Sequence, residues 1–454
     1  MRLHGITVWD GVNDLGPTTL AWDGDQIDEV TPAPRDQYKG LAVIPGLVDT
    51  HVHLGGPAIL TDDSDYTFGT WQLVTSREEQ TMHVAAHAVR AMREGVTTLR
   101  DMAGDHRQIA VRNAFDAELI VGPRLFVFGM VTMTAGHGDM STPPGATQRP
   151  PTADGPDECR ALVRRYARDG VDGIKIAASG GVFSRGDATK WRNHTREEVA
   201  AIVDESHALG LPVAAHAHTE GGIELALAEG IDSLEHGTLI TAEQAERAAD
   251  YGVTVAPTLL SNDRLADGTA PASEVGRAKA KELVARRDIR LRKAREAGVP
   301  FVLGTDSNGH NLPFGSALEE LIRHRDVLGM TDAKALASGT SEAAEALGAG
   351  GRIGRIAPGY GADLLIVRGR PWQDIGVLRP ENLVAVVCRG RVVAGEVPQD
   401  QAQPEARPVT LLREGVPSEN GRPVAESLAE GPERPESARD DLRESLRGSL
   451  QSPL

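Results

Sequence analysis

The chain has 454 residues, 40% of them hydrophobic, which is enough to bury a core in two or three units or in one large barrel. Its 48 basic and 65 acidic side chains give a formal charge of −17, which argues against a nucleic-acid binder with a basic surface. The two cysteines cannot form a disulfide framework, and the sequence shows neither a membrane span nor the apolar core of a signal peptide. We therefore expect a cytoplasmic protein with no membrane and no nucleic-acid partner.

Residues 1–45 are typical of short strands joined by turns. The β-rich runs Ile6–Trp9 and Leu20–Trp22 are each followed directly by an Asp-Gly pair, which favours a hairpin turn. A third apolar run, Leu41–Ile44, leads into the next part of the chain.

From residue 46 to residue 350, short β-rich runs alternate with longer helical runs. This alternation predicts parallel strands joined by crossover helices, and eight such units predict a (β/α)8 barrel of the TIM type, an α/β fold. An open doubly wound sheet is the alternative, but open sheets usually have fewer strands. The eight expected strands are Leu47–Val52, Thr97–Arg100, Leu125–Phe128, Gly173–Ala177, Pro212–Ala215, Ser233–Leu234, Val253–Ala256 and Phe301–Leu303.

The last hundred residues fall into two parts. Residues 351–397 return to β character, and we expect them to form one small β-sandwich domain together with residues 1–45. Residues 398–454 are expected to be a disordered tail, because the segment from residue 401 onward contains no aromatic residue and no lysine but many prolines. The β runs after the barrel are Ala362–Val367, Leu383–Val387 and Gly390–Val393.

Barrel enzymes place their catalytic groups at the C-terminal ends of the strands, so the residues at those ends carry the functional argument. The first strand ends in His51-Val52-His53, and two histidines two positions apart project to the same face of a strand. This arrangement suits two nitrogen ligands of one metal ion. In the fourth strand, Lys175 lies between two isoleucines and points into the barrel, where a charged ammonium is costly. It is therefore either paired with a buried carboxylate, or made neutral or chemically altered by its site.

Three further strand ends carry metal-ligand residue types. The fifth strand ends in His216-Ala217-His218, the sixth in Glu235-His236, and the eighth is followed by Asp306. Because the C-terminal ends of all strands of a barrel meet around one opening, these residues predict a single metal site.

These motifs resemble those of the amidohydrolase superfamily. The resemblance rests on the run Pro-Gly-Leu-Val-Asp-Thr-His-Val-His from Pro45, on Gly-Ile-Lys-Ile-Ala-Ala-Ser-Gly-Gly around Lys175, and on Ala-His-Ala-His-Thr and Ser-Leu-Glu-His-Gly-Thr further along. It covers residues 1–397. The motifs are similar to those of the metal-dependent branch that includes imidazolonepropionase-like proteins and Xaa-Pro dipeptidases, the prolidase-like hydrolases.

The resemblance implies a centre of two divalent metal ions, usually Zn²⁺. It assigns His51, His53 and Asp306 to the more buried ion, and His216 and His236 to the second. It also implies that Lys175 is N-carboxylated and bridges both ions, which would turn a costly buried cation into an anionic oxygen ligand.

The same resemblance implies a mechanism in which a metal-activated hydroxide attacks the substrate carbonyl. Asp306 would accept a proton and pass it to the leaving group. His137, in the loop Met-Thr-Ala-Gly-His-Gly after the third strand, would donate to the carbonyl oxygen. His218 would contact the substrate or support a ligand. Arg185 is a candidate for binding a substrate carboxylate, with a solvated surface residue as the alternative.

We therefore expect an enzyme that cleaves an amide bond in a small molecule such as a dipeptide or an N-acyl amino acid. The alternatives are hydrolysis of a cyclic amide, a carbamate, an ester or an organophosphate. A non-catalytic scaffold is disfavoured because all six expected ligand positions are filled, and a mononuclear deaminase would not need Lys175. Assembly into a homo-oligomer is left open.

Overall fold

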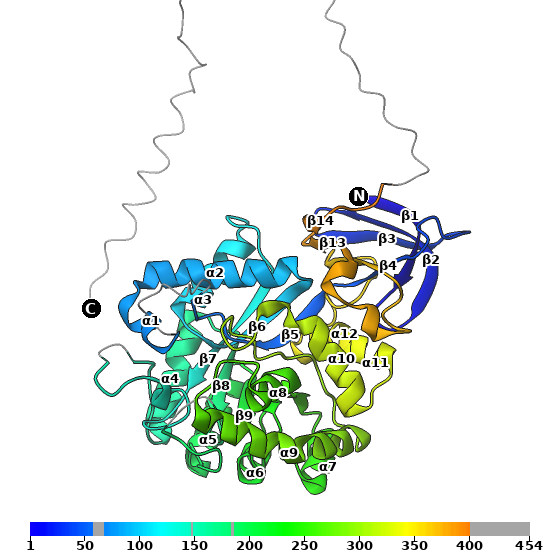
Figure 1. The fold of residues 1–454 in the computed structure, drawn as a ribbon. Coiled ribbons are helices and arrows are strands. Elements are labelled where there is room, and N and C mark those ends of the chain that lie inside the picture. Colours follow the sequence, from blue (N-terminus) through cyan, green and yellow to red (C-terminus); the bar gives the residue numbers. More distant parts are fainter. Residues whose placement is uncertain (58–67, 147–148, 183–185, 400–454) are drawn as a thin grey trace, which may run out of the picture. The chain divides into compact units, whose positions relative to one another are not determined.

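The computed structural model describes residues 1–57, 68–146, 149–182 and 186–399, and these contain two separate seven-stranded sheets (Figure 1). One sheet is parallel and forms most of a barrel, whereas the other is mixed and contains strands from both chain ends. The tail predicted for residues 398–454 lies, from residue 400 onward, outside the described residues and stays a prediction.

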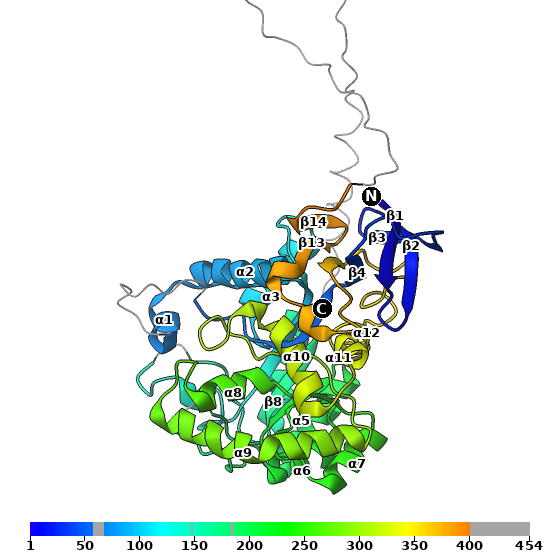
Figure 2. The ribbon, with the colours of Figure 1, turned by 45° about the vertical axis from the view of Figure 1, so that its right-hand side comes forward.

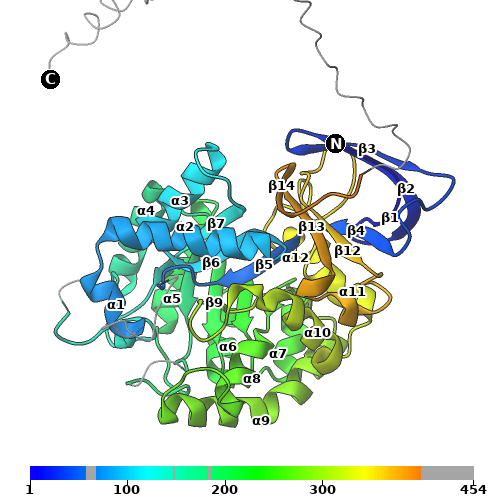
Figure 3. The ribbon, with the colours of Figure 1, turned by 45° about the horizontal axis from the view of Figure 1, so that its top comes forward.

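The mixed sheet joins the two ends of the chain, as predicted. Its central strand β4 pairs in parallel with β1 and in antiparallel with β12, so blue and orange strands lie side by side in Figure 3. Ile6 and Trp22 from the first part pack in one core with Ile366 and Val387 from the second. In spatial order the strands are β14 (Arg391–Gly395), β13 (Leu383–Cys388), β12 (Leu364–Arg368), β4 (Leu41–Pro45), β1 (Arg2–Trp9), β2 (Asp14–Asp23) and β3 (Gln26–Pro32).

The barrel sheet follows the chain order, and every pair of neighbouring strands is parallel. Seven of the predicted runs are strands of this sheet, within a few residues of their expected ends. These strands are β5 (Leu47–Val52), β6 (Val96–Gly104), β7 (Arg124–Val131), β8 (Gly173–Ala177), β9 (Val213–Ala217), β10 (Ser233–His236) and β11 (Thr254–Ala256).

The eighth expected strand, Phe301–Leu303, closes the barrel without forming a regular strand. Phe301 makes a single bridge to Val255 on β11, and the backbone N–H of Thr50 on β5 donates to the carbonyl of Leu303. The Leu303 N–H turns away from both neighbours and donates to Ser338, which interrupts the ladder. The segment also lies so close to β5 that position 304 has no room for a side chain. A Cβ added to Gly304 would lie 2.9 Å from the Cβ of His51.

Helices cover the outside of the barrel, with α6, α7 and α9 together along one side of it (Figure 2). Several begin at threonine caps that the sequence supplies, such as Thr195 and Thr241, each with a reciprocal capping box. Among the described residues no helix combines the length and apolar character needed to cross a membrane. The helices are α1 (Phe68–Val74), α2 (Arg77–Arg93), α3 (His106–Asp116), α4 (Pro156–Asp169), α5 (Arg196–Ala208), α6 (Glu220–Ala228), α7 (Ala242–Asp250), α8 (Leu259–Asp267), α9 (Glu274–Glu296), α10 (Ala317–Leu328), α11 (Asp332–Ser338) and α12 (Ser341–Ala346).

Candidate metal centre

Two groups of potential metal ligands meet at the C-terminal ends of the barrel strands. The first contains His51, His53 and Asp306, whose donor atoms all lie within 4.8 Å of one another. Nε2 of His53 lies 3.3 Å and Nε2 of His51 3.6 Å from Oδ1 of Asp306. Two atoms bound about 2.0 Å from one ion at a tetrahedral angle would lie roughly 3.3 Å apart, so this spacing fits a shared ion.

The carboxylate of Asp306 is set up to be ionised. Burial alone would raise its pKa, but the hydrogen bond from His53 and the charges of His51, His53 and Lys175 outweigh burial and lower the pKa below its usual value. The Ser261 hydroxyl donates to Oδ2 at 3.2 Å, which leaves Oδ1 facing the histidines. Asp306 is therefore an anionic oxygen donor aimed at the first group.

A buried carboxylate fixes the orientation of His51. Its Nδ1 lies 2.6 Å from Oε2 of Glu235, and the other oxygen of Glu235 accepts from Arg100 at 3.0 Å. Burial would raise the pKa of Glu235, but Arg100, Lys175 and His51 lower it to about 2, while burial and Lys175 lower the pKa of His51 to about 4. Because an ionised carboxylate only accepts, Nδ1 of the neutral His51 carries the proton and Nε2 presents its lone pair to the first group.

The second group contains His216, His218 and His236. Nε2 of His216 lies 3.3 Å from the carbonyl oxygen of Gly180, so this nitrogen carries the proton and Nδ1 has the lone pair. That Nδ1 faces Nε2 of His236 at 3.0 Å. Burial lowers the pKa of both imidazoles well below the usual value, so both rings are neutral, and two neutral imidazole nitrogens that face each other suit a metal cation.

Threonine hydroxyls hold the outer nitrogens of this group. Thr258 Oγ1 lies 2.7 Å from Nδ1 of His236, and Thr238 Oγ1 lies 2.8 Å from Nδ1 of His218. The rings of His218 and His236 stack with their centroids 4.4 Å apart, so His218 lies inside the second group. The structure thus brings His218 as close to the site as the two histidines predicted to be ligands.

Lys175 on β8 connects the two groups. It pairs in register with Ala214 on β9, two residues before His216, and its ammonium charge lowers the pKa of His51, His216 and His236. The side chain is buried, its Nζ has no hydrogen-bonding partner within the described part of the chain, and burial lowers its pKa to about 8. A buried amine without a partner and with a lowered pKa fits a nitrogen that becomes carboxylated.

The backbone is strained at this centre. His236 and Asp306 adopt φ values of 71° and 60°, in the left-handed region that residues with a Cβ seldom occupy. Such conformations cost about 1–3 kcal/mol each and occur mostly where function requires them. At Asp306 the backbone N–H donates to the His51 carbonyl at 2.7 Å, which fixes the turn that aims the carboxylate.

His137 lies above the second group. Its ring stacks on His216 with centroids 4.3 Å apart, and its Nδ1 lies 3.5 Å from the buried carboxylate of Asp187. Gly181 allows this approach, because a Cβ there would lie 2.0 Å from a carbon of the His137 ring. The structure therefore places His137 at the opening of the site, whereas Arg185 lies outside the described residues.

Sequence reasoning missed several residues of the centre. Thr258 and Ser261 follow the seventh strand, where no motif marked them, and Asp49 is a buried acid whose pKa rises to about 7 through burial. Arg100 pairs with Glu235 and not with its sequence neighbour Asp101. Arg100 on β6 and Glu235 on β10 lie on strands that are not neighbours in the sheet, so no local sequence pattern indicates this pair.

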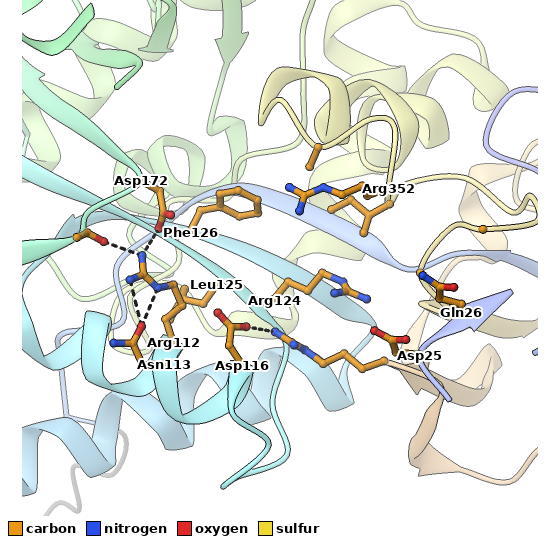
Figure 4. Close-up of a pocket in the computed structure, with 16 residues that line it drawn as sticks. Asp25, Gln26, Arg112, Asn113, Asp116, Arg124, Leu125, Phe126, Asp172 and Arg352 are labelled. Atoms are coloured by element: carbon orange, nitrogen blue, oxygen red, sulfur yellow. Dashed lines mark hydrogen bonds and ion pairs between the residues drawn. The ribbon is translucent and has the colours of Figure 1, made fainter. Parts of the chain in front are cut away.

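A cavity of about 610 Å³ lies at the opposite, N-terminal end of the barrel strands, next to the β2–β3 turn of the mixed sheet (Figure 4). Several of its charged side chains are already paired: Arg112 with Asp172 at 2.7 Å and Arg389 with Asp116 at 2.6 Å. This end of a barrel usually serves stability, and the ion pairs indicate such a role here.

A barrel with this set of ligands at its C-terminal end is typical of metal-dependent hydrolases. The model of the amidohydrolase family matches residues 42–393, and the chain belongs to that family. Metal dependence is general in this family, and the protein is a hydrolase that acts on carbon–nitrogen bonds.

Three comparisons place the chain within the family. Ochratoxinase of Aspergillus niger is 32% identical over 394 residues, which cover 82% of this chain and 80% of the relative. Imidazolonepropionase of Paracoccus denitrificans is 28% identical, over 83% of this chain and 92% of the relative. The crystal structure of a Xaa-Pro dipeptidase with methionine bound in its active site is 30% identical with a TM-score of 0.76, over 86% of this chain and 98% of that one.

Proposed function

We propose that the protein is a binuclear metal-dependent hydrolase that cleaves the amide bond of a dipeptide or an N-acyl amino acid. The observation that carries the proposal is the pair of adjoining ligand groups together with Lys175, which lies on β8 next to the strand of His216 and whose buried Nζ has no hydrogen-bonding partner among the described residues. The ring centroids of His51 and His236, one from each group, are 5.2 Å apart, so the groups adjoin.

The donor set supports a centre of two ions. His51, His53 and Asp306 would hold one ion, His216 and His236 the other, and N-carboxylated Lys175 would contact both. Nitrogen and carboxylate donors at this spacing favour Zn²⁺. When bound, the ions would polarise the scissile carbonyl and lower the pKa of a nucleophilic water.

The residues around the ligands would carry the remaining steps. Asp306 would accept the proton of the attacking water at its carboxylate and deliver it to the leaving nitrogen. His137, which lies over His216 at the opening, would donate a hydrogen bond to the substrate carbonyl oxygen as negative charge develops there. His218 would contact the substrate or support His236, on whose ring it stacks.

The choice of an amide next to an amino acid rests on the relatives. One structure at 30% identity is a Xaa-Pro dipeptidase that holds methionine in its active site. Imidazolonepropionase, at 28% identity, keeps the cyclic amide as the second candidate. Parallel assays with Xaa-Pro and other dipeptides, N-acyl amino acids, cyclic amides and esters would distinguish these classes, and turnover of esters alone would contradict the proposal.

The proton-transfer role is tested by Asp306→Asn. We expect kcat to fall by about 10²–10⁴ in the zinc-loaded enzyme, because the amide cannot accept a proton at neutral pH. Metal content is measured on the same sample, and Asp326→Asn, a change at an exposed acid paired with Arg325, serves as the control. Full activity of Asp306→Asn would rule out the assigned role.

A further inference from the structure

A second cluster of ligand-type side chains lies outside the candidate metal centre. Cys159 on α4, and His194 and Glu198 at the start of α5, are buried, and their donor atoms lie within 4.8 Å of one another. None of these residues belongs to the two groups at the barrel opening. The three side chains offer one sulfur, one nitrogen and one oxygen, which is a donor set typical of Zn²⁺.

The two ring nitrogens of His194 both face oxygen atoms. Its Nε2 lies 3.3 Å from the carbonyl oxygen of Val131, and its Nδ1 lies 3.6 Å from Oε2 of Glu198. A neutral imidazole has one N–H, so only one of its nitrogens can donate to the oxygen it faces. With the proton on Nε2, Nδ1 presents a lone pair to a carboxylate, and it makes no hydrogen bond within the described residues. Nδ1 therefore faces either a proton that it shares with Glu198 or a metal ion.

The distances and charges around the cluster favour a metal ion. The 3.6 Å between Nδ1 of His194 and Oε2 of Glu198 is close to the roughly 3.3 Å expected for two tetrahedral ligands of one ion. Glu198 brings a carboxylate into this buried cluster, and a dication would compensate both that charge and a thiolate.

Glu198 and a nearby carbonyl complete the surroundings. Each oxygen of Glu198 accepts one backbone N–H, from Gly155 and from Thr195, both at 2.7 Å, and each keeps a second lone pair. The thiol of Cys159 donates to the carbonyl oxygen of Ala153 at 3.9 Å. The cluster therefore offers three protein donors to an ion, and water would take the fourth tetrahedral position.

We propose that Cys159, His194 and Glu198 bind a third metal ion of the Zn²⁺ class, which has a structural role. On binding, the Sγ–H bond of Cys159 breaks, the proton leaves to solvent, and the sulfur donates its lone pair to the ion. The ion would tie α4 to the start of α5 beside Val131 and Ala153, whose carbonyl groups already contact His194 and Cys159.

The test uses the full chain loaded with Co²⁺. Because the candidate metal centre offers no sulfur ligand, a thiolate-to-Co²⁺ charge-transfer absorption in the near ultraviolet reports the third site alone. We expect this band in the unchanged protein and in Cys388→Ser, and its loss in Cys159→Ser together with about one equivalent of metal. Cys388 is also buried and is the only other cysteine, so it is a matched control.

A protein that binds Co²⁺ but lacks the thiolate band would overturn the proposal, as would a Cys159→Ser variant with unchanged metal content. Either result would mean that a proton, and not a metal ion, lies between Nδ1 of His194 and Glu198. If Cys159→Ser does not fold, the spectrum of the unchanged protein still decides the question. The hydrolase assignment is independent of this result, because it rests on a site without sulfur.

Discussion

Nδ1 of His51 and Oε2 of Glu235 lie 2.6 Å apart in a part of the barrel that is closed to solvent, and this contact determines which nitrogen of His51 faces Asp306. Arg100 holds Glu235 from the other side and is itself anchored to the Thr50 carbonyl at 2.6 Å. The chain Arg100–Glu235–His51 therefore positions a metal ligand through a carboxylate that does not itself belong to either ligand group.

Glu235→Gln tests this positioning. The neutral amide leaves the buried Arg100 without its counter-charge and weakens the hold on His51, so we expect Zn²⁺ affinity to fall by about 10–100-fold. Competition with a chromophoric chelator measures the affinity, and a thermal unfolding curve verifies that the variant is folded. Glu224→Gln removes an acid from a half-exposed pair with Arg247 and should bind Zn²⁺ like the unchanged protein. Equal affinities for the two variants would contradict the positioning role.

Two substitutions of Thr258 separate the effect of its hydroxyl group from the effect of its branched shape. Thr258→Val keeps the branched side chain but loses the oxygen that lies 2.7 Å from His236, so we expect binding of the second ion to weaken by about 10–100-fold. Thr258→Ser keeps the oxygen and should bind normally. Titration of metal-depleted protein with Zn²⁺ distinguishes the two variants. If Thr258→Ser were impaired as strongly as Thr258→Val, packing of the methyl group would be the cause.

His137→Ala should lower kcat by about 10²–10³ while both ions remain bound, because the donor to the developing oxyanion is lost. Steady-state kinetics with the best substrate of the screen, combined with metal analysis, measures both quantities. His106→Ala, at a largely exposed position beside Asp169, is the control and should retain full activity. A loss of bound metal in His137→Ala would assign this residue to the second ligand group.

Glu320 should make stability depend on pH. Burial raises its pKa from 4.5 to about 8, although the N–H groups of Leu259 and Leu260 donate to its carboxyl group. Between these values the folded state holds a proton that the unfolded state has lost. The stabilisation is therefore complete below pH 4.5 and is lost as pH rises through 8.

Glu320→Gln cannot ionise, so the difference in unfolding free energy between the unchanged protein and this variant should shrink from pH 5 to pH 8 by roughly 2–4 kcal/mol. Urea unfolding of metal-depleted protein at both pH values measures it, which removes the pH dependence of metal binding. Glu319→Gln, at the half-exposed neighbouring position, should show a constant difference. A difference that stays constant from pH 5 to pH 8 would mean that Glu320 is ionised in the folded protein.

Much of the barrel could be predicted because its strands are short, apolar and regularly separated by helices. The strand ends also marked His51, His216 and His236, since the C-terminal ends of parallel strands must meet. The partners of these residues were harder to predict. Thr258 and Ser261 contact the centre only because α8 begins directly beside it, and no local pattern gives the position of a helix start in space.

The eighth strand and the third cluster were also hard to predict, because both depend on contacts between segments that are far apart in the sequence. Phe301–Leu303 reads as a strand, but the contact of Leu303 with Ser338 comes from a helix end far along the chain. Cys159 and His194 are 35 positions apart by their numbers and meet because α4 and α5 pack side by side. The domain boundaries at residues 45 and 350 and the disordered tail stay predictions.

The mixed sheet has a consequence for how the protein is made. Trp22 donates from its indole nitrogen to the carbonyl of Gly390, 368 residues later in the chain, and β4 receives β12 as its neighbour only after the whole barrel has been synthesised. At a synthesis rate of ~5–20 residues per second, the early strands wait roughly 20–75 s for their partners. During that time an apolar strand edge is open to pairing with other chains, so aggregation on the ribosome is the hazard that this topology creates.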